Sequence, residues 1–540
     1  FGIMNIEVGS DGDRMEQLFL SKLRERGHDI NSELFNSITE PLSRIYAIPD
    51  HLHAIINMIG DGLVPSNAKA GYLARMMSRR ILRMRDELGI KLSLSDLATH
   101  HLEFNYDPNR MKQTSEGLLS ILRGEEERYD EMLRKGQNVV RTAIKNIPQD
   151  SDELPDDILF TLSDSHGLSP DIAVKMAKEQ GWSNLTLRTG FNAEMAERHS
   201  AQAKLAAMTS TDSELILDIP DLPATMTLYY DDTFQQNFEA SVLASIPIAS
   251  NHAESMATHA IILDRTCFYP EGGGQEGDYG KLISESSAHT VIDTKKVGNL
   301  VVHISTGPFE IGDIVQGMID WDRRKQLMDH HTSVHIVGGA ARKLLGPHIY
   351  QAGSNKSADS SRLDITHHRR LTRKDLDQIE SIANEVVQNV QRIEKLTLNR
   401  KDADRKFGFD LYQGGAPKGS EIRIIRIGDH DVQACGGTHH DEPSKIGQIR
   451  VVRSSAVQDG VERLHIVAGQ SAMNHARSQE SILRNTAEVF QVQTDDLPNT
   501  ATRFFTEWKE QRKRIELLEA EIVRLRTTGG SSDMLSLIHI

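Results

Sequence analysis

Cysteine is scarce in this chain: only Cys267 and Cys435 occur among its 540 residues. Two cysteines cannot build the disulfide framework of a small secreted protein, so the sequence predicts a reducing, cytoplasmic location. No apolar run reaches the roughly 18 residues that a membrane helix needs, and we expect no membrane association. Residues 1–14 lack an initiator methionine and the pattern of a signal peptide. We therefore expect the chain to begin within a longer protein.

Positive charge is also in short supply, because 62 Lys and Arg face 77 Asp and Glu, giving a net charge of −15. Such an acidic chain is not a general nucleic-acid binder, so any RNA contact must come from local basic clusters. The charged fraction of 26% and the apolar fraction of 38% are ordinary for a globular protein and exclude a wholly disordered chain.

The texture of the sequence changes along the chain and predicts a multidomain α+β protein. Residues 1–215 carry apolar residues at helical spacing, whereas residues 216–325 alternate β-branched and polar residues between glycines. The second pattern is typical of a small barrel or sandwich. Residues 326–475 mix helices and strands, and residues 476–540 begin as a helical arm whose tail breaks the pattern.

Two short motifs could supply a metal site. His331 and His335 are four residues apart, which places both imidazoles on one face of a helix. Cys435 and His439 share the same spacing, and chance gives only about 0.1 such pairing in a chain of this composition. Two imidazoles, a thiolate and a further imidazole suit Zn²⁺. The alternative is a buried structural cysteine with scattered surface histidines.

Two further features are ambiguous on sequence alone. The glycine-rich segment 268–278 is either a flexible turn or a loop that presents Gln275 to a water or a ribose hydroxyl. Arg75, Arg79 and Arg83 share one helical face, beside Arg80. This stripe either contacts phosphates or is a solvated helix surface paired with nearby acids.

The joint order of several motifs resembles the alanyl-tRNA synthetase family, in its archaeal branch. The family motifs are matched by residues 61–80 (DGLVPSNAKAGYLAR with the following arginines), 163–171 (SDSHGLSPD), 268–278 (FYPEGGGQEGD), 331–335, 361–367 (SRLDITH) and 435–439.

The resemblance implies a helical tRNA-recognition region, a barrel and a zinc-binding editing domain. It assigns one Zn²⁺ to His331, His335, Cys435 and His439. It implies that the editing module hydrolyses Ser-tRNA(Ala) and Gly-tRNA(Ala), since a pocket built for alanine rejects serine and glycine weakly.

The residues that the resemblance assigns to the editing pocket are Thr332, as the contact for the serine hydroxyl, Gln275, Arg362 and Asp364. Those assigned to tRNA(Ala) are Asn67 and Asp171, which match readers of the G·U wobble pair, with Arg75, Arg79 and Arg80.

Two motifs that the family carries in its aminoacylation core are not found at the start of the chain. Residues 1–50 contain neither an F-R-x-E motif nor a G-x-G-x-x-R motif. We therefore expect a fragment without the class II aminoacylation core and without the C-terminal domain. ATP and Mg²⁺ would serve only the missing core, and we assign no ATP-binding residue. A homodimer is allowed for the full-length parent.

Three readings follow from these observations. The first is a fragment that binds tRNA(Ala) and performs zinc-dependent editing. The second is a free-standing trans-editing deacylase, although such enzymes lack the tRNA-recognition block of residues 65–80. The third is a non-catalytic tRNA-binding module, because four protein ligands fill the tetrahedron of a structural zinc.

Overall fold

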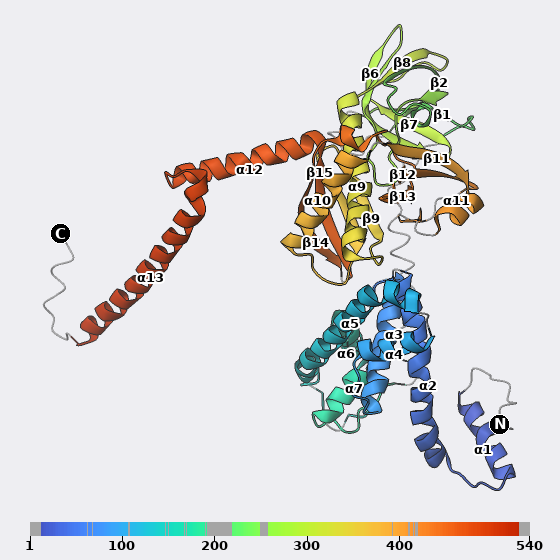
Figure 1. Cartoon of the computed structure of the whole chain (residues 1–540), viewed down its shortest axis with the longest axis vertical. Coiled ribbons are helices and arrows are strands. Elements are labelled where there is room, and N and C mark those ends of the chain that lie inside the picture. Colours follow the sequence, from blue (N-terminus) through green and yellow to red (C-terminus); the bar gives the residue numbers. More distant parts are fainter. Residues whose placement is uncertain are drawn as a thin grey trace. The chain divides into compact units, whose positions relative to one another are not determined.

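The structure is a computed structural model, and it divides the chain into two compact units, residues 1–468 and 469–540. Figure 1 shows its helices and strands. The structure describes residues 12–61, 63–66, 69–105, 108–145, 147–148, 151–166, 168, 170–188, 191, 219–248, 257–390, 392–408, 411–413, 415, 419–458 and 460–528.

The N-terminal part of the first unit is helical, as predicted. Its helices are α1 (Gly12–Glu25), α2 (Ser32–Gly60), α3 (Lys69–Glu87), α4 (Leu94–Asn105), α5 (Pro108–Ala143), α6 (Asp156–His166) and α7 (Pro170–Glu179). Apolar side chains spaced by three and four residues point to a common core, which includes Ile55, Ile81 and Leu122. Burying these side chains stabilises the helices far more than their intrinsic propensity does.

Helix α5 lies at the centre of this region rather than at its surface. The stretch 117–136 is highly charged with apolar residues every three or four positions, which predicts a helix with one solvent-lined face, and its apolar residues form a buried face. Leu118, Ile121 and Leu122 are at most 3% exposed. Glu125 is fully buried on the same face, where it receives hydrogen bonds from Arg75.

The middle of the first unit is a closed six-stranded barrel with the strand order β2-β3-β7-β6-β5-β8. All neighbouring strands are antiparallel. A closed sheet has no free edge. The strands are β2 (Asn237–Pro247), β3 (His259–Leu263), β5 (Gly280–Ile283), β6 (Ala288–Val297), β7 (Leu300–Ser305) and β8 (Ile314–Ile319), preceded by η1 (Leu228–Tyr230) and the parallel pair β1 (Met226–Thr227) and β4 (Arg265–Thr266). The barrel predicted from the alternating pattern is confirmed.

A fully buried histidine in the barrel makes its stability depend on pH. His303 Nδ1–H donates to the Ile261 carbonyl at 3.0 Å, and Nε2 accepts from the Thr266 hydroxyl at 2.8 Å, so the neutral ring is satisfied. Burial lowers the pKa of His303 to about 4. The unfolded chain takes up this proton near pH 6.5 while the folded barrel does not, so stability is lost as pH falls from about 6.5 towards 4.

We expect this histidine to account for roughly 1–3 kcal/mol of the stability difference between pH 7 and pH 4. Urea denaturation at several pH values should show the loss in the natural chain and a shallower pH dependence in His303→Gln. Equal pH dependence in the two proteins would contradict the assignment.

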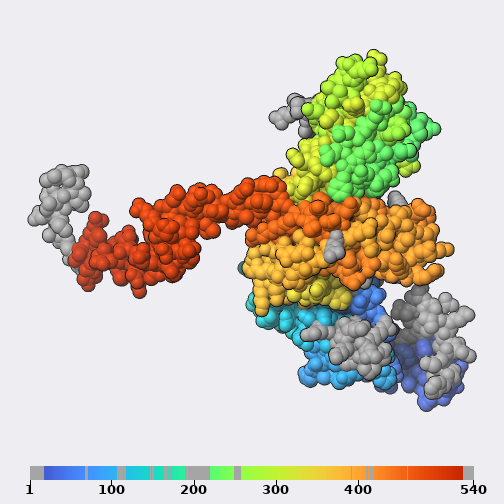
Figure 2. Space-filling model, turned by 45° about the horizontal axis from the view of Figure 1, so that its top comes forward, coloured from blue at the N-terminus to red at the C-terminus, as the bar shows by residue number. Residues whose placement is uncertain are grey.

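The rest of the first unit is an α+β region, as predicted. A four-stranded antiparallel sheet, ordered β14-β15-β10-β9, is packed against α9 and α10, and a three-stranded sheet has the order β11-β12-β13. The elements are α9 (Trp321–Leu345), β9 (Gln351–Lys356), β10 (Ser361–Thr366), α10 (Arg373–Asn389), β11 (Ile393–Asn399), α11 (Arg400–Phe407), β12 (Glu421–Ile427), β13 (Asp431–Ala434), η3 (Pro443–Ile446), β14 (Ile449–Gln458) and β15 (Val461–Ala468). Figure 2 shows the barrel packed directly on this region.

The second unit consists of α12 (Gly469–Val489), η4 (Thr494–Asp496) and α13 (Leu497–Thr528). The helical arm predicted from the apolar seam is therefore confirmed as a helix. Its apolar side chains stay exposed; Trp508 is 47% and Leu518 54% accessible. The divergent tail after residue 528 lies outside the described residues.

The three boundaries between the four predicted domains remain predictions, because the structure separates only the two units given above. Among the described residues, no helix combines the length and the apolar character needed to span a bilayer.

Candidate metal centre

Helix α9 presents the first half of the site. Asp320 caps its N-terminus by accepting from the backbone N–H of Arg323 at 3.1 Å. The helix is buried on almost every side, as Val334, Ile336 and Val337 are at most 1% exposed. A helix that is enclosed in this way can hold its histidines out of water.

The second half of the site is the loop that follows β13. Arg423 fixes this loop by donating to the carbonyl oxygens of Cys435 and Gly437, each at 2.8 Å. A Cβ atom at Gly437 would lie 2.0 Å from the His331 ring. Only glycine therefore lets the loop pass so close to α9.

The four predicted ligands come together in the structure. One ligand atom from each of His331, His335, Cys435 and His439 lies within 4.8 Å of the others. Cys435 Sγ is 3.3 Å from His331 Nε2 and 3.4 Å from His439 Nε2. The donor set of three imidazoles and one thiolate fits Zn²⁺. The neighbours His330 and His440 point elsewhere, since they bond to the Ser357 carbonyl and to Asp329.

Each histidine of this centre is anchored through its other ring nitrogen. His331 Nδ1–H donates to Gln275 Oε1 at 2.7 Å. His335 Nδ1 lies 3.3 Å from Asp431 Oδ2, and His439 Nδ1 lies 3.2 Å from Thr332 Oγ1. Partners of this kind fix the tautomer, so that Nε2 is left to bind a metal.

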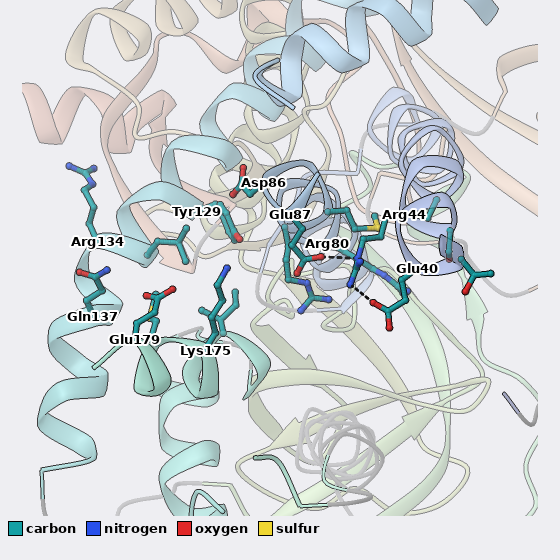
Figure 3. Close-up of a pocket in the computed structure, with 18 residues that line it drawn as sticks. Glu40, Arg44, Arg80, Asp86, Glu87, Tyr129, Arg134, Gln137, Lys175 and Glu179 are labelled. Carbon is teal, nitrogen blue, oxygen red and sulfur yellow. Dashed lines mark hydrogen bonds and ion pairs between the residues drawn. The ribbon is translucent and has the colours of Figure 1, made fainter. Parts of the chain in front are cut away.

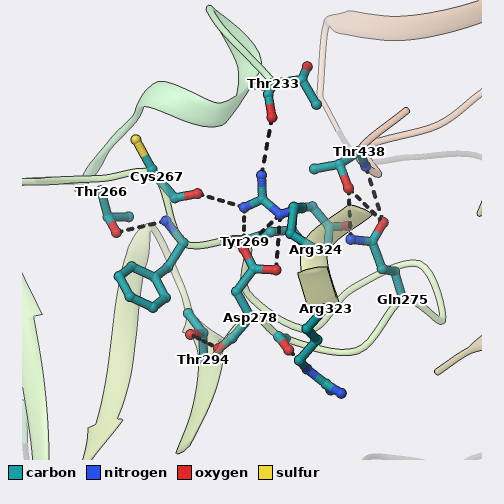
Figure 4. Close-up of polar contacts among 12 residues, drawn as sticks. Thr233, Thr266, Cys267, Tyr269, Gln275, Asp278, Thr294, Arg323, Arg324 and Thr438 are labelled. Carbon is teal, nitrogen blue, oxygen red and sulfur yellow. Dashed lines mark hydrogen bonds and ion pairs between the residues drawn. The ribbon is translucent and has the colours of Figure 1, made fainter. Parts of the chain in front are cut away.

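Gln275 reaches the centre because the glycine-rich segment is held in place. The backbone N–H of Lys356 donates to the Gly274 carbonyl at 2.6 Å, and Gly274 has a φ of +73°. Thr438 then receives the Gln275 amide at 2.9 Å, as Figure 4 shows. The segment is therefore a fixed turn rather than a flexible one, and Gln275 holds a ligand instead of a water or a ribose.

Burial and mutual charge set the protonation of the four groups. Partial burial alone would raise the pKa of Cys435, but the facing imidazoles outweigh it and hold this pKa well below its usual value. Burial lowers the pKa of His331 to about 4 and that of His439 well below its usual value. Burial would also lower the pKa of His335, but Cys435 and Asp431 raise it to about 9. At neutral pH the group thus supplies a thiolate and two neutral imidazoles, those of His331 and His439, whereas His335 must release a proton to bind a metal.

Gln275→Ala is expected to weaken zinc binding by roughly 10–100-fold, because His331 loses the acceptor that orients it. Competition with a chromophoric chelator measures this affinity. Gln316→Ala, at an exposed position on β8, is the matched control and should bind zinc normally. Unchanged affinity in Gln275→Ala would contradict the positioning role.

A buried ion pair beside the centre was not foreseen from the sequence. Arg324 is fully buried, and its Nε donates to both carboxylate oxygens of Asp278 at 2.9 Å. Its Nη2 also donates to the Cys267 carbonyl at 2.7 Å (Figure 4). The pair joins α9 to the barrel and so supports the histidines about two and three turns further along.

Of the remaining predicted pocket residues, Thr332 contacts the ligand group, whereas Arg362 and Asp364 have other surroundings. Asp364 is bound by Arg463, with Nε to Oδ1 at 2.7 Å, and Arg362 is exposed on β10. Thr332 is buried, with its hydroxyl against His439. Of the four predicted pocket residues, therefore, Gln275 and Thr332 are in contact with the ligands.

The residues predicted to contact tRNA differ in their burial and in their hydrogen-bond partners. Arg75 is 3% exposed, and its guanidinium donates hydrogen bonds to Glu125, so it is a structural residue. The prediction that Arg75, Arg79 and Arg83 form one phosphate-binding stripe is therefore wrong for Arg75. Arg79 is half-buried and bonds to Glu125 as well. Asn67 and the side chain of Asp171 lie outside the described residues, although the backbone of Asp171 belongs to α7.

Arg80 instead lines a cleft of about 890 Å³ in the helical region. Arg83, Lys175 and Arg134 contribute further cations, and Figure 3 shows the labelled side chains around the cleft. Acidic residues line it too, among them Glu87, which pairs with Arg44 at 2.9 Å. The cleft thus carries both signs of charge.

Two family models match the chain. The model of class II (A) tRNA synthetases matches residues 13–323. The model of the threonyl and alanyl tRNA synthetase second additional domain matches residues 422–465, which include Cys435 and His439. The chain therefore belongs to the class II (A) tRNA synthetases.

Curated relatives narrow the class. The chain is 40% identical over 502 residues to the alanine–tRNA ligase of Thermococcus kodakarensis, covering 92% of this chain and 53% of that protein. It is 38% identical over 509 residues to the alanine–tRNA ligase of Haloquadratum walsbyi, covering 94% and 53%. The chain thus belongs to the alanyl-tRNA synthetase family, in its archaeal-like form, and spans about half the length of the curated relatives it matches.

One expectation about the family is overturned. We expected the class II core to be missing, but the class II model matches from residue 13 to residue 323. The expectation depended on two short motifs within residues 1–50. A family model weighs hundreds of positions together, so the absence of two short patterns does not remove the match.

Proposed function

We propose that the metal centre hydrolyses the ester bond of mischarged Ser-tRNA(Ala) and Gly-tRNA(Ala), as the editing activity of an alanine–tRNA ligase. The observation that carries this proposal is the convergence of four ligand atoms within 4.8 Å, two of them inside the segment that matches the second additional domain. When bound, Zn²⁺ would supply a fixed positive charge that anchors the substrate or polarises the ester. The chain's own part is to hold these ligands in place.

The arrangement around Thr332 suggests how serine could be distinguished from alanine. A hydroxyl can accept one hydrogen bond and donate another. Thr332 Oγ1 accepts from His439 Nδ1–H at 3.2 Å, which leaves its O–H to donate. A serine hydroxyl brought next to Thr332 would satisfy that donor, whereas the methyl group of alanine would not. We infer that Thr332 contributes to the preference for serine.

For tRNA(Ala), we propose that the cleft lined by Arg80 and Arg83 contacts phosphates. Asp171, the inferred reader of the wobble pair, is the second residue of α7, and the same helix places Lys175 in that cleft. The attachment of alanine to tRNA(Ala), with ATP and Mg²⁺, is the reaction we infer for the full-length relatives. A reducing, cytoplasmic setting suits a centre that needs a thiolate.

The proposal is tested with the chain as it exists, loaded with zinc and mixed with Ser-tRNA(Ala). We expect serine release from metal-replete protein, no release after chelation, and recovery when zinc is restored. Ala-tRNA(Ala) is the control substrate and should stay intact. Hydrolysis that continues unchanged after chelation would overturn the metal-dependent mechanism.

One observation favours a second candidate, a tRNA-binding module with a structural zinc. Four protein ligands already complete a tetrahedron, which is the habit of structural sites. This candidate predicts that chelation unfolds the α+β region while metal-replete protein never releases serine. A free-standing trans-editing deacylase is less favoured, because the class II match extends over the helical region.

A further inference from the structure

A second group of histidines lies away from the metal centre. His348 follows α9, whereas His367 and His368 follow β10. One ring nitrogen from each of the three lies within 4.8 Å of the others. The group brings together residues that are about 20 positions apart in sequence, and neither the proposed editing reaction nor the RNA contacts use it.

The three rings are close enough to share one ion. His348 Nε2 lies 2.9 Å from His367 Nδ1, and the two rings are stacked with centroids 5.2 Å apart. The His368 ring is 4.7 Å from that of His367 and 5.4 Å from that of His348. Each of His348 and His367 is only 3% exposed.

Each of these rings also has an unsatisfied nitrogen. Within the described part of the chain, no hydrogen-bond partner is found for His348 Nδ1, His367 Nε2 or His368 Nδ1, although all three atoms are buried. Native proteins pair nearly all such atoms, so three unpaired nitrogens in one cluster indicate that a water or an ion binds there. Burial lowers the pKa values of the three rings to about 4, 3 and 4, which keeps them neutral.

We propose that His348, His367 and His368 bind a second divalent transition-metal ion of the Zn²⁺ type. Neutral imidazoles are the ligands that such ions favour, and three of them leave one coordination position for a water molecule. Two nearby cations would oppose the ion: Arg369 is paired with its own carboxylate, whereas Arg128 shares the Glu125 carboxylate with Arg75 and Arg79. Arg369 binds Asp375 at 2.8 Å, and Arg128 lies 3.4 Å from Glu125.

The site would fasten the helical region to the α+β region of the first unit. Ser120, on α5, lies 3.2 Å from His368 Nε2, and the Arg128 guanidinium donates to the His368 carbonyl. A Cβ atom at Gly117 or at Gly124 would come within 3.9 Å of the His348 or the His368 ring. An ion held here would therefore order the loop after α9, the end of β10 and the adjoining face of α5.

The test titrates the metal-free, full-length chain with Co²⁺ and follows its absorption spectrum. Thiolate ligation at Cys435 gives a sulfur-to-cobalt charge-transfer band that an all-imidazole site lacks. We expect two equivalents in the natural chain. His348→Gln/His367→Gln should bind one equivalent and keep that band, whereas Cys435→Ser should bind one equivalent without it.

Two further variants serve as controls, one for the loss of histidines in general and one for misfolding of the double variant. His53→Gln/His101→Gln alters another close histidine pair, 3.3 Å apart, and should still bind two equivalents. His368→Gln, at a partly exposed position, should weaken the second equivalent at least tenfold if the double variant fails to fold. The proposal is overturned if the natural chain binds one equivalent, or if the second survives unchanged in both His367 and His368 variants. Either result leaves the centre at Cys435 intact.

Discussion

Cys435→Ser is expected to remove zinc from the metal centre and to abolish Ser-tRNA(Ala) hydrolysis. The sulfur is the one soft ligand of the group, and it lies 3.3 Å from His331 Nε2 and 3.4 Å from His439 Nε2. A serine hydroxyl is shorter and stays protonated, so it cannot replace a thiolate. We expect zinc affinity to fall by more than about 100-fold, beyond the range for an outer partner.

Elemental analysis and a deacylation assay on the same preparation measure both effects. Cys267→Ala is the matched control, because it removes the other thiol. Burial raises the pKa of Cys267 to about 12, so it is an inert thiol in the barrel. This variant should keep the zinc of the centre. Full hydrolysis by zinc-free Cys435→Ser would separate the metal from the reaction.

Arg324→Leu is expected to destabilise the first unit by about 3–5 kcal/mol, since it leaves the Asp278 carboxylate buried without its partner. Asp278 is 1% exposed and also accepts from the Tyr269 N–H at 2.6 Å, so it cannot turn towards water. The free energy of unfolding from urea titration is the measurement. The double variant Arg324→Leu/Asp278→Leu should recover part of the loss.

The matched control for this prediction is an exposed ion pair. Arg373 and Asp377 on α10 are 57% and 56% exposed, and they are 2.7 Å apart. Pairs of this kind contribute roughly 0–1 kcal/mol, so Arg373→Leu should change stability little. Similar losses of unfolding free energy in Arg324→Leu and Arg373→Leu would show that the buried pair stabilises the protein no more than the exposed pair.

Most of the correct predictions came from the spacing of residues that are close together in the sequence. The four-residue separations within 331–335 and 435–439 are short-range patterns, and a helix or tight loop turns them directly into geometry. The residues of 300–305 and 421–426 also predict strands from a local pattern, and β7 and β12 confirm these two strands. Such patterns predict structure well because residues close in sequence determine the helix or strand that they form.

What the sequence could not predict depends on distant partners. Arg75 was expected at an RNA surface, but Glu125, 50 residues further on, captures it inside the helical core. Gln275 was placed in the pocket, yet its amide is committed to His331, 56 residues away. The Asp278–Arg324 pair and the His348 cluster gave no signal for the same reason, since tertiary packing alone creates them.

The centre at Cys435 joins two strips of chain that are 100 residues apart, with His335 on one strip and Cys435 on the other. A bound ion would therefore act as a reversible cross-link. Cross-linking a loop of that size restricts the unfolded chain by about 4–5 kcal/mol in a simple entropy model. Cells short of zinc would then hold this polypeptide in a form that proteases digest more readily, coupling its lifetime to metal supply.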